Sequence, residues 1–231
     1  MFGLLSGLGL WLVHPPEQKP ESTNVVTAAD ATSLRSARFA LGLLALAQQK
    51  VPQRAGTAPI TDFERSVAER ARQFLLFRAP GFRDDCSGYA SAVFSGSGVP
   101  MDGVVASLWE LAERNGALHG DPVPRVGDLV FFDDTHDRNH NGRVDDPLTH
   151  VGVVIDVEPD GTAVFAHAGT SVGRTTGRIN LERPWVNREA SRRVVNSYLR
   201  EPEAWDPPET LYLAGELWAG FATVDPKQDW L

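Results

Sequence analysis

The chain is organised around the stretch RDDCSGYASAVF, residues 83–94, which contains its only cysteine, Cys86. Asp85 is a good helix N-cap, alanines and aromatic residues follow at helical spacing, and Gly96 marks a stop. The stretch predicts a short buried helix that begins at the cysteine. Unpaired N–H groups and the positive end of the helix dipole favour a thiolate there, as a nucleophile needs. The alternative is a small buried hydrophobic side chain.

Composition and charge narrow the class of protein. The 231 residues fit one domain of about 120–150 residues with additions at both ends. A hydrophobic content of 42% and a charged content of 23% are typical of a globular protein with a real core. The net charge of -8 argues against nucleic acid or anionic lipid as a partner. A single cysteine excludes an intrachain disulfide and an all-thiolate zinc site.

The first residues, Met1 to Val13, are apolar and rich in glycine. They are too few to span a bilayer, which needs about 20 apolar residues, and they lack the charged start and cleavage site of a secretory signal. They are a clipped signal peptide, a misassigned start or a tail that packs on the body. Of these we favour export, and hence a periplasmic or secreted protein.

Helices precede strands along the chain. A capping box and an apolar repeat predict a helix over Thr61 to Phe77. A further helix is expected from Val104 to Asn115, and Gly116 ends it. Strands are then expected at 128–132, 150–156 and 162–167, with an edge strand at 178–181 and later strands at 194–199 and 211–224. This order predicts an α+β domain whose N-terminal helices pack on a central antiparallel sheet.

Two of the six histidines are candidates for a catalytic base. His150 begins one predicted strand and His167 ends the next, so a hairpin would make them neighbours across the ladder. A cysteine at a helix N-terminus beside them is the cysteine, histidine and polar residue arrangement of papain-like enzymes. The alternative is that both are structural histidines.

Three ordered motifs resemble the signatures of the NlpC-type cell-wall cysteine peptidases: DCSGY at 85–89, GDLVFF at 127–132 and HVGVVI at 150–155. The resemblance covers about Phe63 to Leu181. It implies a papain-like fold in which Cys86 is the nucleophile, His150 the general base and His167 the orienting residue. It further implies that Asp85 and Ser87 line the site and hold a free amine of the substrate.

The resemblance also implies a reaction and a domain plan. The reaction is hydrolysis of peptide bonds in peptidoglycan stem peptides, often next to D-glutamate and diaminopimelate. The approach to the cysteine, residues 77–84, lacks the family's substrate-contacting tyrosine, which leaves the substrate preference open. The plan is an apolar segment and linker at 1–27, a helical extension at 28–60, the peptidase domain at 61–181 and a β extension packed on it at 182–231.

An insertion before His150 is similar to the start of an EF-hand loop. Its oxygen donors would bind a structural calcium ion, although Leu148 stands where the usual bidentate glutamate would be. The alternatives are a solvated turn and a less favourable zinc pair from His136 and His140. The expected calcium ligands are Asp137, Asn139, Asn141, the carbonyl of Arg143, Asp145 and Asp146.

Other functions remain open at this point. The string GTSVG at 169–173 matches a serine-hydrolase elbow, but poor helix-forming residues follow it, so we reject it. The same fold could be a non-catalytic, calcium-stabilised cell-wall binding module, or a thiol amidase or acyltransferase on another substrate. We expect a monomer whose chemistry requires no cofactor.

Overall fold

The structure is a computed structural model that describes residues 59–231. The apolar segment and linker at 1–27 and nearly all of the helical extension at 28–60 lie outside these residues. Within residues 59–231, the helices are too short or too polar to cross a membrane.

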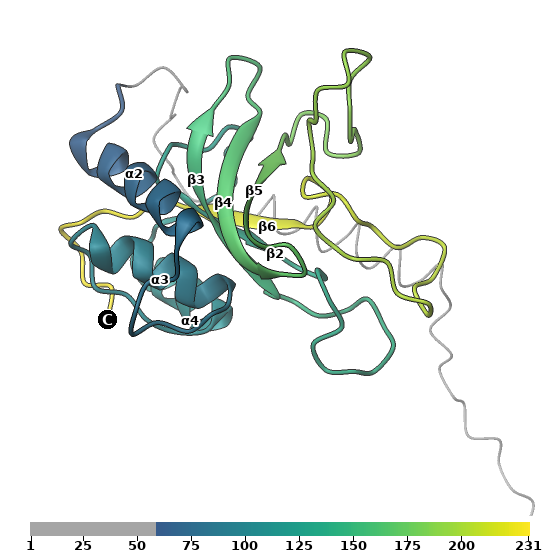
Figure 1. Ribbon diagram of the computed structural model, residues 1–231, viewed down its shortest axis with the longest axis horizontal. Helices are drawn as coiled ribbons and strands as arrows, with labels where there is room; N and C mark the ends of the chain where they lie inside the picture. The colour runs from purple at the N-terminus through teal and green to yellow at the C-terminus, as the bar shows by residue number, and fades with distance from the viewer. Residues whose placement is uncertain (1–58) are drawn as a thin grey trace, which may run out of the picture.

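Three helices open the described chain (Figure 1): α2 (Asp62–Leu76), α3 (Cys86–Gly96) and α4 (Val105–Arg114). The predicted capping box is present, because Thr61 Oγ1 accepts the Glu64 N–H at 3.2 Å and Glu64 accepts the Thr61 N–H at 2.7 Å. Each helix begins and ends within a residue or two of its predicted bounds.

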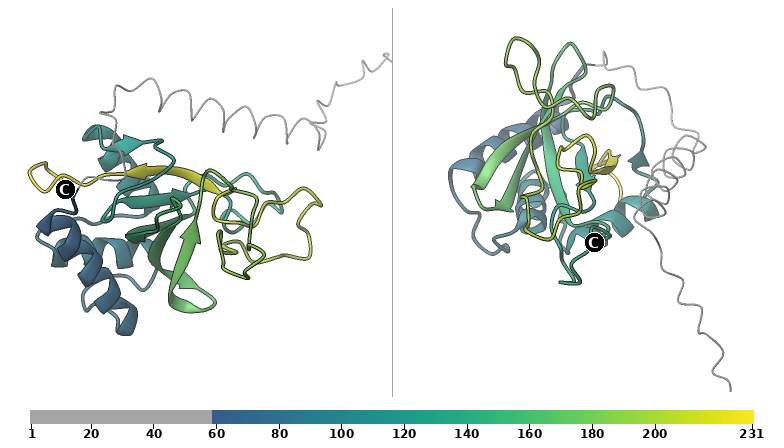
Figure 2. Two further views of the ribbon diagram at one scale, coloured as in Figure 1. Left: turned by 90° about the horizontal axis from the view of Figure 1, so that it is seen from above. Right: turned by 90° about the vertical axis from the view of Figure 1, so that its right-hand side faces the viewer.

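A six-stranded antiparallel sheet follows, in the order β1-β6-β2-β3-β4-β5. The strands are β1 (Leu118–His119), β2 (Leu129–Phe132), β3 (His150–Val157), β4 (Ala163–Thr170), β5 (Gly173–Ile179) and β6 (Trp218–Ala222). The helices lie on one side of this sheet and the loops between β5 and β6 lie on the other, as Figures 1 and 2 show. The expected α+β class, with helices packed on a central antiparallel sheet, is confirmed.

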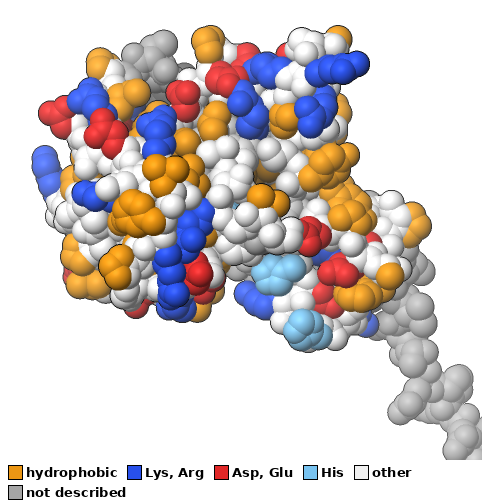
Figure 3. Space-filling model, viewed as in Figure 1, with side chains coloured by type: hydrophobic (Ala, Val, Ile, Leu, Met, Phe, Trp, Pro, Cys, Tyr) orange, Lys and Arg blue, Asp and Glu red, His pale blue; other side chains and the backbone are white. Residues whose placement is uncertain are grey.

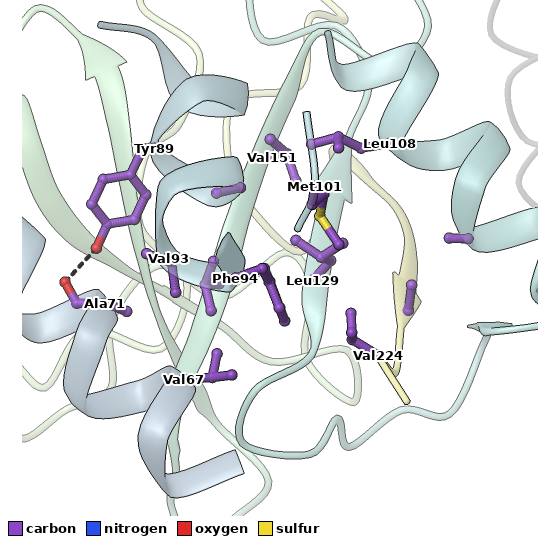
Figure 4. Packing of buried hydrophobic residues seen from close by; sticks show 14 of the residues in the cluster. Val67, Ala71, Tyr89, Val93, Phe94, Met101, Leu108, Leu129, Val151 and Val224 are labelled. Atoms are coloured by element: carbon purple, nitrogen blue, oxygen red, sulfur yellow. Dashed lines mark hydrogen bonds between the residues drawn. The ribbon is translucent and has the colours of Figure 1, made fainter. Parts of the chain in front are cut away.

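The main core lies between the helices and the sheet (Figure 4). Val93 and Phe94 of α3 are fully buried with Val67 of α2, Leu129 of β2 and Val151 of β3. Burial of each such side chain stabilises the fold by about 1.5–3 kcal/mol, so α3 is held firmly against β3. The N-terminus of α3 is thereby positioned at the end of the sheet where β3 begins.

The C-terminal segment differs from expectation in two ways. The strand expected at 194–199 is not formed, and the one expected at 211–224 shrinks to β6, which lies inside the sheet between β1 and β2. Side-chain hydrogen bonds replace a ladder: the Asn196 amide accepts the Asn180 N–H and donates to the carbonyls of Arg183 and Val186. Polar side chains that satisfy the backbone in this way compete with strand formation.

Candidate active site

Cys86 is the first residue of α3, and the Asp85 carboxylate caps that helix by accepting the Gly88 N–H at 2.6 Å. The Cys86 side chain is only 9% exposed. Its sulfur accepts a hydrogen bond from the backbone N–H of Val151, the residue that follows His150. Folding therefore brings the thiol to the beginning of β3.

The protonation state of the thiol differs from the sequence expectation. Burial raises the pKa of Cys86 to about 11, and the negative charge of Asp85 adds to this rise. The N–H groups of Val151, Ser87 and Cys86 itself lower the pKa, but by less than burial raises it. The helix N-terminus thus acts in the expected direction and is outweighed by desolvation. At neutral pH the resting group is a thiol, which needs a base when it reacts.

His150 and His167 form a buried pair. His150 Nε2 lies 3.0 Å from His167 Nδ1, and the two rings meet edge to face with centroids 5.0 Å apart. Phe132 and Phe165 flank the pair on the same side of the sheet. Both imidazoles are about 4% exposed, so they are shielded from water and held in place by aromatic contacts.

The two histidines are neighbours across the ladder, as the hairpin argument predicted, but they are offset in register and do not lie directly opposite each other. Val153 pairs with Ala166, which puts His167 level with Gly152. Gly152 has no side chain, and a Cβ there would lie 2.7 Å from Phe165. The rings meet diagonally across a glycine position instead.

Burial keeps both imidazoles neutral. Burial lowers the pKa of His167 to about 4. Burial also lowers the pKa of His150 well below its usual value, and repulsion from a positive charge on His167 or His136 adds to this effect. A neutral imidazole has one N–H and one free lone pair. If His150 donates Nε2–H to His167, its Nδ1 is free to accept a proton.

A glycine allows β4 to approach the cysteine. Gly169 has φ +81°, and a Cβ on it would lie 3.0 Å from the Cys86 nitrogen. Gly169 is also the first residue of the GTSVG sequence that resembled a serine-hydrolase elbow. In the structure this sequence forms the turn between β4, which ends at Thr170, and β5, which begins at Gly173. A serine-hydrolase elbow would be followed by a helix, so the hairpin agrees with the rejection of Ser171 as a nucleophile.

Asp85 and Ser87 are engaged by an arginine that the sequence reading did not single out. Arg83 lies 3.2 Å from the Asp85 carboxylate and 3.1 Å from Ser87 Oγ, and Ser87 Oγ donates to Asp85 at 2.9 Å. Partial burial would raise the pKa of Asp85, but the bonds from Gly88, Ser87 and Arg83 lower it overall. The two residues expected to hold an amine are thus already bound to a guanidinium. The only sequence signal was a cation two residues before Asp85.

The insertion loop folds around two buried carboxylates. Asp137 accepts the N–H groups of Asn141 at 3.2 Å and Gly142 at 2.8 Å. Asp146 accepts the Arg138 N–H at 3.1 Å and the Asn139 amide at 2.9 Å. Among residues 59–231, no group of three or more His, Cys, Asp or Glu residues could hold a metal ion. An ion in this loop would therefore depend on amide and backbone oxygens as well.

Comparison with known proteins supports the class of the site. Residues 78–169, which contain the cysteine and both histidines, match the family model of the CHAP domain, a cysteine/histidine-dependent amidohydrolase/peptidase. This match confirms the resemblance to cell-wall cysteine peptidases for that segment.

A solved structure is also similar, a lipoprotein-like protein of the NLP/P60 family from Staphylococcus aureus subsp. aureus Mu50. It is 20% identical with a TM-score of 0.35, and the match covers 55% of this chain and 40% of that chain. No curated protein matches the chain.

Proposed function

We propose that the protein is a cysteine hydrolase that cuts amide bonds in bacterial cell-wall stem peptides. The observation that carries this proposal is the hydrogen bond from the Val151 N–H to the Cys86 sulfur, because Val151 follows His150, which pairs with His167. The match of this segment to the CHAP domain adds independent support. An extracytoplasmic location, where the cell wall is, follows from the same proposal.

The proposed reaction is acyl transfer to water. Cys86 Sγ attacks the amide carbonyl carbon while its proton passes to Nδ1 of His150, and backbone N–H groups near Cys86 stabilise the oxyanion. The resulting imidazolium donates Nε2–H to His167, which stays neutral because its pKa is about 4. His150 then protonates the leaving amine, and the C–N bond breaks. Water, deprotonated by His150, releases the acid and restores the thiol.

Digestion of purified cell-wall sacculi tests the proposal. The protein should release peptide fragments, and mass spectrometry of those fragments identifies the bond that is cut. Cys86→Ala should release none, whereas Ser171→Ala should work normally because its hydroxyl contacts Glu201 on the surface. Substrate should also protect the active protein from inactivation by iodoacetamide. Fragment release by Cys86→Ala would overturn the cysteine mechanism, and intact sacculi in every reaction would favour the binding-module alternative.

We also propose that the 137–146 loop binds a structural calcium ion. Asp137 and Asp146 supply two buried carboxylates, and Asn139 contacts both Asp146 and the Asn141 N–H, so the oxygen-bearing side chains converge. Hard oxygen ligands of this kind suit calcium. The loop lies between β2 and His150, so an ion there would hold the strand that carries the base and take no part in the chemistry.

A further inference from the structure

Three large aromatic side chains are exposed on the loops between β5 and β6. Trp185 is 69% exposed, Tyr198 68% and Trp205 54%. Figure 3 shows hydrophobic side chains gathered over these loops, at the right of the view. We call Trp185, Tyr198 and Trp205 the aromatic row. Exposed apolar surface that is gathered in one place marks a binding site.

The backbone brings the first two members of the row together. Tyr198 pairs with Leu213 in an isolated antiparallel bridge. Pro184, the residue before Trp185, lies against Gly215, because a Cβ on that glycine would be 2.6 Å from the Pro184 Cα. Residues 213 and 215 are only two peptide units apart, which span at most about 8 Å. Trp185 and Tyr198 are therefore attached to neighbouring points of the surface.

A buried ion pair fixes the turn that carries Trp205. The side chains of Arg200 and Asp206 pair across this turn and are 1% and 2% exposed. Asp206 also accepts the Glu203 N–H at 2.9 Å and the hydroxyl of Tyr212 at 3.2 Å, which ties the turn to the segment beside Tyr198. Removing two charges from water is costly, and here it supports a turn whose tryptophan remains in solvent. This arrangement suits binding better than it suits stability.

The turn that carries Trp205 also meets the edge of the active site. Glu201 accepts a hydrogen bond from the Ser171 hydroxyl in the turn between β4 and β5. Gly169, two residues before Ser171, lies against the Cys86 backbone. A long ligand that lies on the aromatic row can therefore continue towards the nucleophile.

The composition of the surface favours a sugar over a protein as the ligand. Within residues 182–213, the exposed large hydrophobic side chains are the three of the aromatic row, and none is aliphatic. Exposed carboxylates stand among them, at Glu201, Glu203 and Glu209. Aromatic faces stack on the C–H faces of sugar rings, and carboxylates accept hydrogen bonds from sugar hydroxyls. The core of a protein interface, by contrast, is depleted of glutamate.

We propose that the aromatic row binds the glycan strand of the cell wall and thereby brings the attached stem peptides to Cys86. The choice of this glycan rests on the proposed function, whereas the sugar chemistry rests on the row itself. A strand held on the row raises the effective concentration of its peptides at the active site. The row is a second binding site, on the opposite side of the sheet from the helices, and takes no part in the chemistry.

The test uses glycan strands freed of their stem peptides as the probe. Calorimetry with Cys86→Ala measures binding without turnover. The strands should bind, and adding Trp205→Ala should weaken binding by about three- to tenfold, because one stacked ring is lost. Tyr198→Ala should weaken it further by a similar factor. Leu76→Ala removes an exposed apolar side chain from the end of α2, is the matched control and should leave the affinity unchanged.

Failure of Cys86→Ala to bind the strands, or equal affinity after Trp205→Ala, would overturn the inference. So would a dimer in light scattering that Trp205→Ala dissociates, because the row would then bind a second copy of the chain. Digestion of sacculi by the unaltered protein tests the proposed function separately. If no fragments are released and the strands still bind through Trp205, the hydrolase is wrong and the glycan site stands; release without strand binding means the reverse.

Discussion

The ionisable groups at the two ends of the β3–β4 hairpin are in opposite charge states. At one end, His150 and His167 are buried and neutral. At the other, Glu158 and Asp160 form ion pairs with three arginines, Arg178, Arg183 and Arg193. Hydrogen bonds from Arg193 hold the pKa of Asp160 well below its usual range.

The difference shows that neutrality at the active-site end comes from the surroundings of the hairpin. Burial without a counter-charge favours the neutral form, whereas half-exposed partners of opposite sign favour the charged form. In the proposed mechanism, a neutral imidazole can accept the proton of a neutral thiol at the moment of attack, whereas a histidine that is already protonated could not.

The largest expected effect is on activity, and only at the neutral end. Replacing His150 with Ala removes the proposed base and should lower hydrolysis by about 10²–10⁴-fold, because the thiol has a high pKa and needs proton transfer. Glu158→Gln, at the charged end of the same hairpin, should leave the rate unchanged. Rates on sacculi measure both. Equal rates for His150→Ala and the unaltered protein would show that another group is the base.

The second effect is on stability as the pH falls. The pKa of His167 is about 4 when folded and about 6.5 when unfolded, so only the unfolded chain binds the proton between these values. The stabilisation is present above pH 6.5 and is lost as the pH falls towards 4, by about 3 kcal/mol for this group. Urea unfolding at several pH values should show this slope, and His167→Asn, which cannot charge, should flatten it. An unchanged slope in that variant would assign the pH dependence to other groups.

A third effect concerns the loop that leads into the active-site end. If calcium binds the 137–146 loop, a concentration of 100 times Kd stabilises the fold by about 2.7 kcal/mol and raises the Tm by several degrees. Asp137→Ala should abolish the shift, and Asp121→Ala, a carboxylate outside the loop, should preserve it. If calcium causes no shift in the Tm of the unaltered protein in calorimetry, the proposal that the 137–146 loop binds calcium is wrong.

The smallest effect is expected at the charged end. Asp160→Asn removes one charge from a half-exposed network, so solvent screening limits the loss of stability to about 1 kcal/mol or less, and high salt should reduce it further. Denaturant unfolding at low and high salt measures it. A large loss of stability that does not depend on salt would mean that solvent does not screen these ion pairs.

Local pattern was enough to locate the elements of the site. Each of these elements depends on residues that are close together in the sequence: the capping box before α2, the N-cap before Cys86, and the apolar strands after Gly127 and from His150. Each element therefore lies close to its predicted position. The strand expected at 194–199 did not form and the one expected at 211–224 is shortened to β6, since Asn196 and the buried Arg200–Asp206 ion pair satisfy polar groups through distant partners that local propensity does not include.

By itself the sequence determined the α+β class and singled out one cysteine and two histidines, because short-range periodicity and capping encode helices and strands. Only the tertiary structure decided that the thiol is protonated, that His167 is level with Gly152, that Arg83 occupies Asp85 and that β6 lies inside the sheet. Desolvation and ion pairing depend on groups brought together from distant parts of the chain, and no local window of sequence contains them.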